Sequence, residues 1–249
     1  MPFLDHLEEL RWRILKSLGS VFLFTVVAFP LTGLLLDFLT KPNDRLEEPA
    51  KLIFLKPTGM LMVRMEVALA VGIIISLPII FYQFWQFVAP GLLPKEKKHF
   101  LPALLFTTCC FLMGATFAYT VLIPTVLPFL FSMGTEAIEA NINITEYMSF
   151  VLRLILVAGL IFELPVLSFF LSRTGIITPK FLKKYRRYGI VLVFIFSAIV
   201  TPPDPMSQVL MAFPLLLLYQ VSIWISILGY RKKKASDRAW QKEPPTDLL

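Results

Sequence analysis

Acidic side chains at the edges and in the middle of apolar segments are the first candidates for chemistry in this sequence. Glu163 lies in the apolar run 158–165, Glu9 lies in an amphipathic stretch near the N-terminus, and Glu96 stands among lysines in a polar loop. A charge at the centre of a bilayer costs about 2.5–3.5 kcal/mol on insertion scales, so Glu163 is expected to face a cavity or a polar partner. The alternative is a protonated or internally hydrogen-bonded carboxyl without a function.

The residue types that enzymes and metal sites need are scarce. The chain has two histidines, His6 and His99, and two adjacent cysteines, Cys109 and Cys110, inside an apolar run. This set excludes a metal site that needs several imidazoles and gives no disulfide framework. Glycines with the spacing of a P-loop or of a dinucleotide fingerprint are also absent. We therefore predict no cofactor, no metal and no enzymatic activity.

The composition predicts a membrane protein. Of the 249 residues, 57% are hydrophobic and 16% are charged, and the mean hydropathy is +0.73. Soluble domains contain about 45–50% apolar and about 25% charged residues. Such an excess of apolar residues requires lipid as the solvent. The net charge of +7 is therefore assigned to loops on the cytoplasmic side and not to nucleic-acid binding.

Six apolar segments are candidates for membrane helices, which gives an all-α polytopic fold. A bilayer core requires about 20 apolar residues per helix. The fifth segment has only 14 residues, roughly 21 Å of helix against a core of roughly 30 Å. The predicted segments are Ile14–Leu36, Leu61–Val88, Phe100–Ile123, Ser149–Leu171, Tyr188–Thr201 and Met206–Leu228.

Charge and proline patterns extend this prediction. Most of the 24 lysines and arginines fall in the N-terminus, the C-terminal tail and two alternate loops, which places both termini in the cytoplasm. Residues 1–229 form one predicted transmembrane domain, and residues 230–249 form a basic tail that we expect to be disordered. Pro78, Pro165 and Pro214 lie inside apolar segments, where proline bends a helix. They favour a curved, concave wall.

Short motifs along nearly the whole chain resemble the TatC family, the core subunit of the twin-arginine protein translocase. The short fifth segment fits the same family. The matching motifs, in order, are His6-Leu-x-Glu9-Leu10-Arg11-x-Arg13, Ser76-Leu-Pro78-x-x-x-Tyr82-Gln83-x-Trp85-x-Phe87-x-Ala89-Pro90-Gly91-Leu92, Glu96-Lys97, Phe162-Glu163-x-Pro165, Gly175-Ile-x-Thr178, Arg186, Thr201-Pro202-Pro203-Asp204-x-x-Ser207-Gln208 and Pro214-Leu-Leu-Leu-Leu-Tyr219.

The resemblance implies a receptor in the cytoplasmic membrane for signal peptides with paired arginines. It implies proton-gradient-driven export of folded proteins, single-span TatA- and TatB-type partners docking along the fifth helix, and several copies in one complex. It places Glu163 in the concave membrane cavity. The signal-peptide site would consist of Glu9, Arg11, Gln83, Phe87, Ala89, Pro90 and Glu96, and the outer face would contain Pro42, Asp204 and Gln208.

Some positions depart from the family pattern, and two other functions stay open. Gln220 and Gly59 stand where the family usually or often has Glu, and Glu66 stands where Lys is common. Gln220 bears on a partner contact at the sixth helix. A proton-coupled solute transporter that uses Glu163 is the main alternative, but it leaves Glu9 and Glu96 at the interface unexplained. A structural membrane scaffold is the third possibility.

Overall fold

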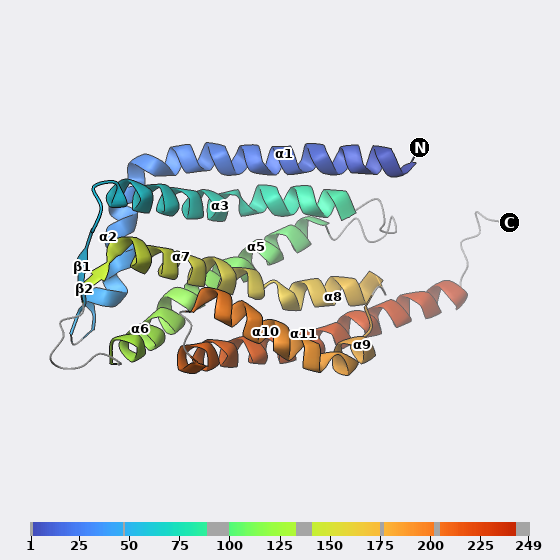
Figure 1. Cartoon of the computed structure of the whole chain (residues 1–249). Coiled ribbons are helices and arrows are strands. Elements are labelled where there is room, and N and C mark those ends of the chain that lie inside the picture. Colours follow the sequence, from blue (N-terminus) through green and yellow to red (C-terminus); the bar gives the residue numbers. More distant parts are fainter. Residues whose placement is uncertain are drawn as a thin grey trace. The chain divides into compact units, whose positions relative to one another are not determined.

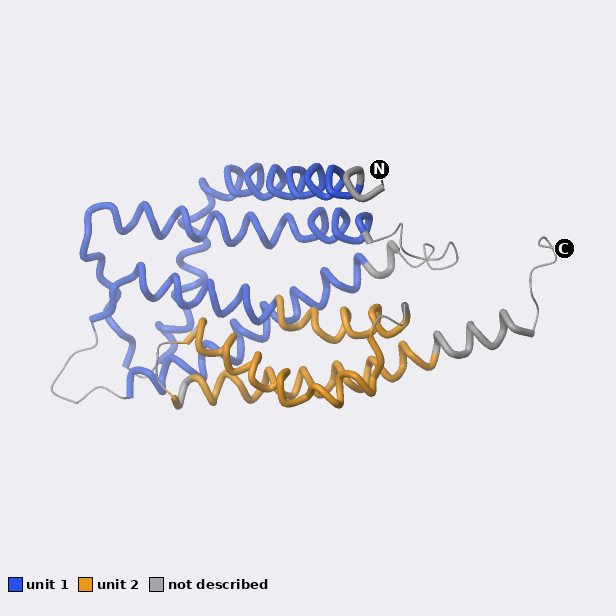
Figure 2. The backbone as a smooth tube through the Cα atoms, turned by 45° about the vertical axis from the view of Figure 1, so that its right-hand side comes forward, with its two compact units in different colours: residues 1–159 blue, residues 160–249 orange. Residues whose placement is uncertain are grey.

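The computed structural model describes residues 2–46, 48–88, 100–132, 141–174, 177–201 and 205–242. Most of these residues are helical, which confirms the predicted all-α class. The chain divides into two compact units, residues 1–159 and residues 160–249 (Figure 2). The concave wall and the single transmembrane domain predicted from the sequence stay predictions.

Two long antiparallel helices lie side by side in unit 1, α1 (Pro2–Ala28) and α3 (Gly59–Val88) (Figure 1). The N-terminus of α1 and the C-terminus of α3 lie at the same end, away from the short strands β1 and β2. This antiparallel arrangement brings residues 6–13 next to residues 83–87, although they are far apart in the sequence. The other elements of unit 1 are η1 (Phe29–Leu31), α2 (Thr32–Asp44), β1 (Lys51–Ile53), α5 (Phe100–Phe117), η3 (Ala118–Leu122), α6 (Ile123–Ser132), β2 (Asn141–Asn143) and α7 (Ile144–Ile161).

Prolines accompany two of the irregular helical turns in unit 1. Pro30 lies in η1, a 3₁₀ turn that joins α1 to α2. Pro124, the second residue of α6, lies two residues after the end of the π-helical segment η3, which connects α5 to α6. Proline lacks the amide hydrogen that the α-helical ladder needs, so local 3₁₀ or π geometry at such places is expected. The chain is therefore helical through both regions, but in more than one straight piece.

A small cap of strands and side-chain hydrogen bonds closes the other end of unit 1. β1 and β2 pair in parallel, with Leu52 opposite Ile142. The side-chain amide of Asn43 donates to the Ala50 carbonyl over 3.0 Å, and its oxygen accepts from the Ala50 amide over 3.1 Å. The hydroxyl of Tyr147 donates to the Leu39 carbonyl over 3.1 Å. These contacts fasten the end of α2 to the segment that leads into β1 and to the first turn of α7.

Unit 2 is built around its longest helix, α11 (Pro205–Lys242), which contacts the three other helices of the unit. The helix α9 (Pro179–Lys184) begins at a cap in which the Thr178 hydroxyl accepts a hydrogen bond from the Phe181 amide over 3.2 Å. Tyr219 of α11 donates its hydroxyl to the Leu182 carbonyl over 3.1 Å. The remaining helices are α8 (Leu164–Thr174) and α10 (Arg186–Val200).

Five helical stretches in the described part of the chain are long and apolar enough to cross a membrane. The helix α10 has only 15 residues, about 22 Å at 1.5 Å per residue, so the shortness predicted for the fifth segment is present. The count of six spans and the cytoplasmic position of the termini stay predictions. The five stretches are His6–Asp44, Gly59–Phe87, Leu104–Ser132, Ile144–Arg173 and Gln208–Arg231.

Two segments differ from the sequence prediction. The fourth apolar segment, predicted as one helix with a bend, contains a two-residue break, because α7 ends at Ile161 and α8 begins at Leu164. Of the tail 230–249, which is predicted to be disordered, residues 230–242 belong to α11, and residues 243–249 lie outside the described residues. Residues 231–242 contain several good helix formers and no proline before position 244, so nothing local ends the helix. In contrast, α3 and α11 each continue through their internal proline.

Large apolar side chains cover much of the helix surface. Phe22 and Leu34 are each 73% exposed, and Leu69, Leu160 and Trp224 are also exposed. A soluble protein rarely leaves so many large apolar groups in water. Lipid contact removes this cost, in agreement with the composition of the sequence.

Candidate functional site

An ion pair near the start of α1 is the nucleus of the candidate site. Arg13 follows Glu9 by four residues, so both side chains lie on one face of the helix. The Arg13 Nε–H donates to Glu9 Oε1 over 3.0 Å, and the Nη2 group of Arg13 contacts the same carboxylate oxygen. Glu9 is therefore already engaged by a guanidinium of its own helix.

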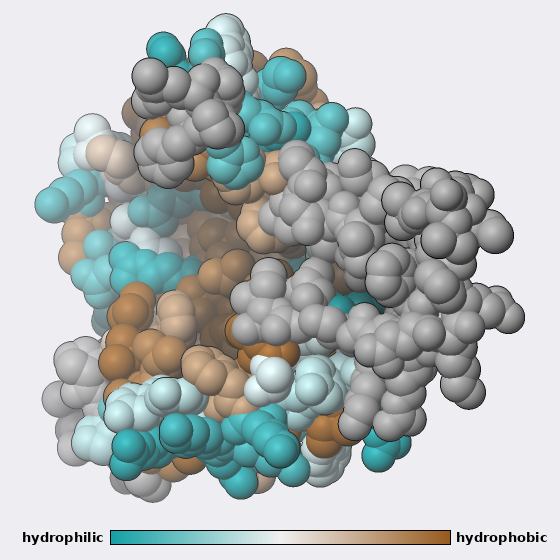
Figure 3. Space-filling model, turned by 90° about the vertical axis from the view of Figure 1, so that its right-hand side faces the viewer, coloured by the Kyte–Doolittle hydropathy of each residue, from teal (hydrophilic) through white to brown (hydrophobic). Residues whose placement is uncertain are grey.

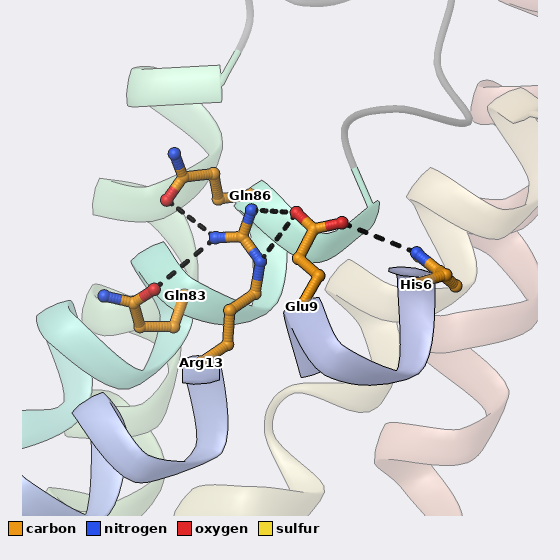
Figure 4. A network of polar contacts seen from close by, with 5 residues as sticks. All are labelled: His6, Glu9, Arg13, Gln83 and Gln86. Atoms are coloured by element: carbon orange, nitrogen blue, oxygen red, sulfur yellow. Dashed lines mark hydrogen bonds and ion pairs between the residues drawn. The ribbon is translucent and has the colours of Figure 1, made fainter. Parts of the chain in front are cut away.

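Two glutamines on α3 hold the other side of the same guanidinium (Figure 4). The Nη1 group of Arg13 donates to Gln86 Oε1 over 2.7 Å and to Gln83 Oε1 over 3.5 Å. Gln83 and Gln86 are three residues apart, which places them on the same face of α3. Side chains of both helices therefore converge on one planar cation.

A histidine adds an aromatic contact to this cluster. The rings of His6 and Phe87 are stacked, with their centroids 4.3 Å apart and an interplanar angle of 13°. His6 Nδ1 also lies 3.5 Å from Glu9 Oε2. The first turns of α1 are thus joined to the last turns of α3 by one stacked ring pair and one polar network.

The cluster is accessible from the end of unit 1 at which α1 begins and α3 ends. The Glu9 side chain is 34% exposed, whereas the Arg13 side chain is 15% exposed. Hydrophilic and hydrophobic side chains are both visible on this end (Figure 3). Mixed surfaces of this kind are typical of helix ends that meet lipid head groups. A ligand would reach Glu9 more easily than Arg13.

The structure brings together only part of the predicted signal-peptide site. Glu9, Gln83 and Phe87 belong to the cluster. Arg11 is exposed on α1, and at about 100° per residue it points roughly 160° away from Glu9. Three further predicted site residues lie outside the described residues, namely Ala89, Pro90 and Glu96.

Sequence reasoning left Arg13 and Gln86 out of the site. Their local signals were present, since Glu9 and Arg13 have the spacing of a helical ion pair, and Gln83 and Gln86 share a helix face. The sequence does not show the register between α1 and α3. This register brings Arg13 into contact with Gln83 and Gln86, which lie about 70 positions away in the sequence. That register depends on packing along the whole helix pair and cannot be read from either motif.

Glu163 lies between α7 and α8 and is buried. Its amide donates to the Leu160 carbonyl over 3.1 Å, and its carbonyl accepts the Leu167 amide over 2.9 Å. The residue is only 3% exposed. The backbone of Glu163 therefore starts α8 while its side chain stays inside the protein. Whether the carboxyl lines a cavity used in transport stays a prediction.

The predicted outer-face residues are anchored near helix ends. Pro42 is buried in the last turn of α2, next to Asn43. Gln208 of α11 donates its side-chain amide to the Phe194 carbonyl over 3.1 Å, and its own carbonyl accepts the Ser197 hydroxyl over 2.8 Å. Gln208 thereby ties α11 to α10. Asp204 lies outside the described residues.

The positions that depart from the family pattern have distinct surroundings. Gln220 Oε1 is buried and, among the described residues, no hydrogen bond to it is found. Glu66 Oε2 accepts the Ser149 hydroxyl over 2.6 Å. Glu66, Ser149 and Arg153 line a cavity of about 160 Å³ that is otherwise apolar. A Cβ on Gly59 would lie 3.5 Å from Thr145 Oγ1, an ordinary contact.

Comparisons with known proteins identify relatives along most of the chain. The family model described as Sec-independent protein translocase protein (TatC) matches residues 5–214. The protein of that name from Aquifex aeolicus (strain VF5) is 40% identical over 241 residues, which are 96% of this chain and 100% of the relative. The protein of the same name from Helicobacter pylori (strain J99) is 42% identical over 221 residues, 89% of this chain and 87% of the relative.

Solved structures agree with the sequence relatives. A crystal structure described as the twin arginine translocase receptor TatC has a TM-score of 0.84 and 39% sequence identity, and the match covers 90% of this chain and 99% of that one. A second crystal structure of this receptor, in the detergent DDM, has a TM-score of 0.83. The fold and these likenesses define a multi-pass membrane protein of a protein translocase. The chain belongs to the TatC family.

Proposed function

We propose that this chain is the receptor subunit of a twin-arginine translocase. It lies in the cytoplasmic membrane with both termini in the cytoplasm, and it binds signal peptides with paired arginines where α1 begins and α3 ends. It thereby supports the proton-gradient-driven export of folded proteins. The observation that carries the proposal is the Arg13 guanidinium, held by one carboxylate and two amide oxygens from two helices. Side chains that hold one guanidinium in this way have the chemistry to hold another.

The chemistry of the cluster favours arginine over lysine. A guanidinium is planar and carries five N–H donors, so it can satisfy several oxygens in one plane. An ammonium is a compact charge with three donors and cannot make the same set of contacts. A hydrogen bond to a charged group contributes about 1.5–3 kcal/mol. Glu9 and Gln83 together therefore provide a basis for selecting arginine.

The remaining parts of the site come from the family resemblance. Glu96 would take the second arginine of the peptide, and Arg11, Phe87, Ala89 and Pro90 would shape the groove around it. The relatives are described as translocase components and as a receptor, which supports the receptor role. The comparisons do not support the alternative of a proton-coupled solute transporter that uses Glu163.

Partners are proposed on the same basis. Single-span subunits of the TatA and TatB type would dock along α10, whose 15 residues leave it shorter than a bilayer core. More than one copy of this chain would be present in the active complex. Pro42, Asp204 and Gln208 would lie on the outer face, and Glu163 would lie in the membrane cavity.

The test is a binding measurement on the full chain in detergent or nanodiscs. A labelled signal peptide with Arg-Arg should bind more tightly than the same peptide with Lys-Lys. Glu9→Gln and Glu96→Gln should each weaken Arg-Arg binding about tenfold to a hundredfold. Glu146→Gln is the matched control, because Glu146 is an exposed acid in the first turn of α7, away from the cluster. Equal binding of both peptides, with no effect of either substitution, would contradict the proposal.

A further inference from the structure

We propose that Arg13 is an internal competitor of the signal peptide. Its guanidinium occupies the place on Glu9 that one peptide arginine takes, and the peptide must displace it to bind. This inference rests on the function proposed above and adds a specificity-determining residue to it. It also assigns a role to Gln86, which holds the displaced guanidinium.

The first observation is that the recognition carboxylate is occupied in the protein itself. Glu9 Oε1 accepts two N–H groups of Arg13, and Glu9 Oε2 lies 3.5 Å from His6 Nδ1. Both carboxylate oxygens therefore face a group of the same helix. The charge of Glu9 is neutralised by Arg13 before any ligand binds. A cationic ligand therefore encounters the Glu9–Arg13 ion pair and not a free carboxylate.

The second observation concerns the charges around Glu9, which make simple sharing of the carboxylate unfavourable. Arg13 lies four residues after Glu9 on α1 and already contacts its carboxylate. A second guanidinium on Glu9 would stand beside that of Arg13 and be repelled by it. Exchange avoids this repulsion, because the incoming guanidinium replaces the outgoing one at the same oxygens.

The third observation shows where Arg13 can go. Gln86 is exposed, and its contact with Arg13 Nη1 over 2.7 Å does not involve Glu9. Arg13 can therefore break its contacts to Glu9 and keep a partner on α3. The path is short, since only the head of one long side chain moves. No change of helix position is required.

Internal competition sharpens the selection of paired arginines. A ligand must bind Glu9 better than Arg13 does, and Arg13 is fixed on the same helix at the ideal i, i+4 spacing. Lysine lacks the planar set of donors that this exchange needs, so it should compete poorly. Specificity often depends on such an element that penalises the wrong ligand. Removing Arg13 should therefore increase the affinity for every cationic peptide, and the increase should be largest for the Lys-Lys peptide.

The primary test measures peptide binding to the Arg13→Ala variant of the full chain. We expect Arg-Arg peptide to bind roughly tenfold more tightly than to the parent, because a larger fraction of the site is competent. The ratio of affinities for Arg-Arg and Lys-Lys peptides should fall. Lys16→Ala is the matched control, since it removes an exposed cation from the same helix. It should change both affinities only slightly and leave their ratio unchanged.

Two further measurements separate competition from a general charge effect. The double variant Glu9→Gln, Arg13→Ala should show no gain over Glu9→Gln alone, because the gain requires the carboxylate. Guanidinium chloride at about ten millimolar should compete with the peptide in Arg13→Ala but much less in the parent, with sodium chloride at equal ionic strength as the reference. Arg13→Gln gives the same expectations and keeps a long polar side chain, in case Arg13→Ala folds poorly.

The outcomes distinguish this inference from the function on which it rests. If Arg13→Ala and Arg13→Gln fold and bind Arg-Arg peptide as weakly as the parent, or more weakly, Arg13 positions Glu9 and does not compete with the ligand. In that case the loss of binding in Glu9→Gln still supports the receptor function. If the parent itself does not distinguish Arg-Arg from Lys-Lys and Glu9→Gln has no effect, the receptor function fails first.

Discussion

Gly72 of α3 lies against the backbone of Thr25 in α1. A Cβ atom on Gly72 would come within 2.7 Å of the Thr25 amide nitrogen and 2.9 Å of the Thr25 Cα. The neighbouring Ser76 is fully buried and donates its hydroxyl to the Gly72 carbonyl over 2.6 Å. Small residues allow such close approach of membrane helices, where packing and not hydrophobic exclusion drives association. This contact fixes the α1–α3 pair that positions the guanidinium cluster.

The first prediction concerns this contact. Gly72→Leu should destabilise the protein by about 1–3 kcal/mol or more, because the new side chain meets backbone atoms that cannot move aside. Gly19→Leu is the control, since Gly19 of α1 has nothing within 4 Å of its missing Cβ. Thermal unfolding in the same detergent measures both variants. Equal stability of the two variants would contradict the close α1–α3 contact.

The bounds of several helices could be predicted because their sequence signals are local. The second apolar segment was expected from Leu61 to Val88 and is found as α3 (Gly59–Val88). The fifth was expected from Tyr188 to Thr201 and is found as α10. In both cases apolar runs end in charged or proline-containing segments. Boundaries of this kind follow from the length and polarity of the run alone.

Other features depend on contacts that the sequence does not reveal. The cluster around Arg13 forms only when α1 and α3 pack in one particular register. The close contact at Gly72 helps to fix that register, and the sequence does not show which residue of α1 packs against Gly72. The break at Glu163, by contrast, has a local cause. Pro165 has no amide hydrogen for the Ile161 carbonyl, and the helix ends at Ile161 and begins again at Leu164.

A second prediction concerns the cap at the end of unit 1 away from the cluster. Asn43 is 2% exposed and exchanges two hydrogen bonds with Ala50. Asn43→Asp keeps an acceptor for the Ala50 amide but leaves the Ala50 carbonyl without its donor and buries a charge. We expect a loss of about 1–3 kcal/mol. Thr40→Ala is the control, because Thr40 makes an exposed hydrogen bond within its own helix α2, to the Asp37 carbonyl. Hydrogen exchange at the Ala50 amide should rise in Asn43→Asp and stay low in Thr40→Ala.

A third prediction concerns the buried acid of unit 2. Glu163→Gln should fold with little loss of stability, because the amide has nearly the same shape and still forms hydrogen bonds. Glu163→Lys should be clearly less stable, because a longer cation would have to be buried at a site that is 3% exposed. Expression level and thermal unfolding of the two variants measure this difference. A Lys variant as stable as the Gln variant would show that the site opens to water or lipid head groups.

The last prediction concerns the length of α10. The helix has 15 residues, about 22 Å, against a bilayer core of about 30 Å. Such a mismatch thins or distorts the surrounding bilayer, and each ångström contributes a fraction of a kcal/mol. We expect this short helix to matter for partner docking in the proposed complex.

The test is to lengthen α10 in its middle by about eleven leucines, which add three turns and keep the helix faces in phase. The longer helix, about 39 Å, should remove the thinning and reduce both crosslinking to single-span partners and export of a twin-arginine cargo. The control replaces the exposed Val191, Ile195 and Ile199 with leucine, which changes composition at constant length. This control should retain crosslinking and export. If the lengthened variant exports cargo at the rate of the parent, the shortness of α10 has no part in docking, and partners must recognise its side chains alone.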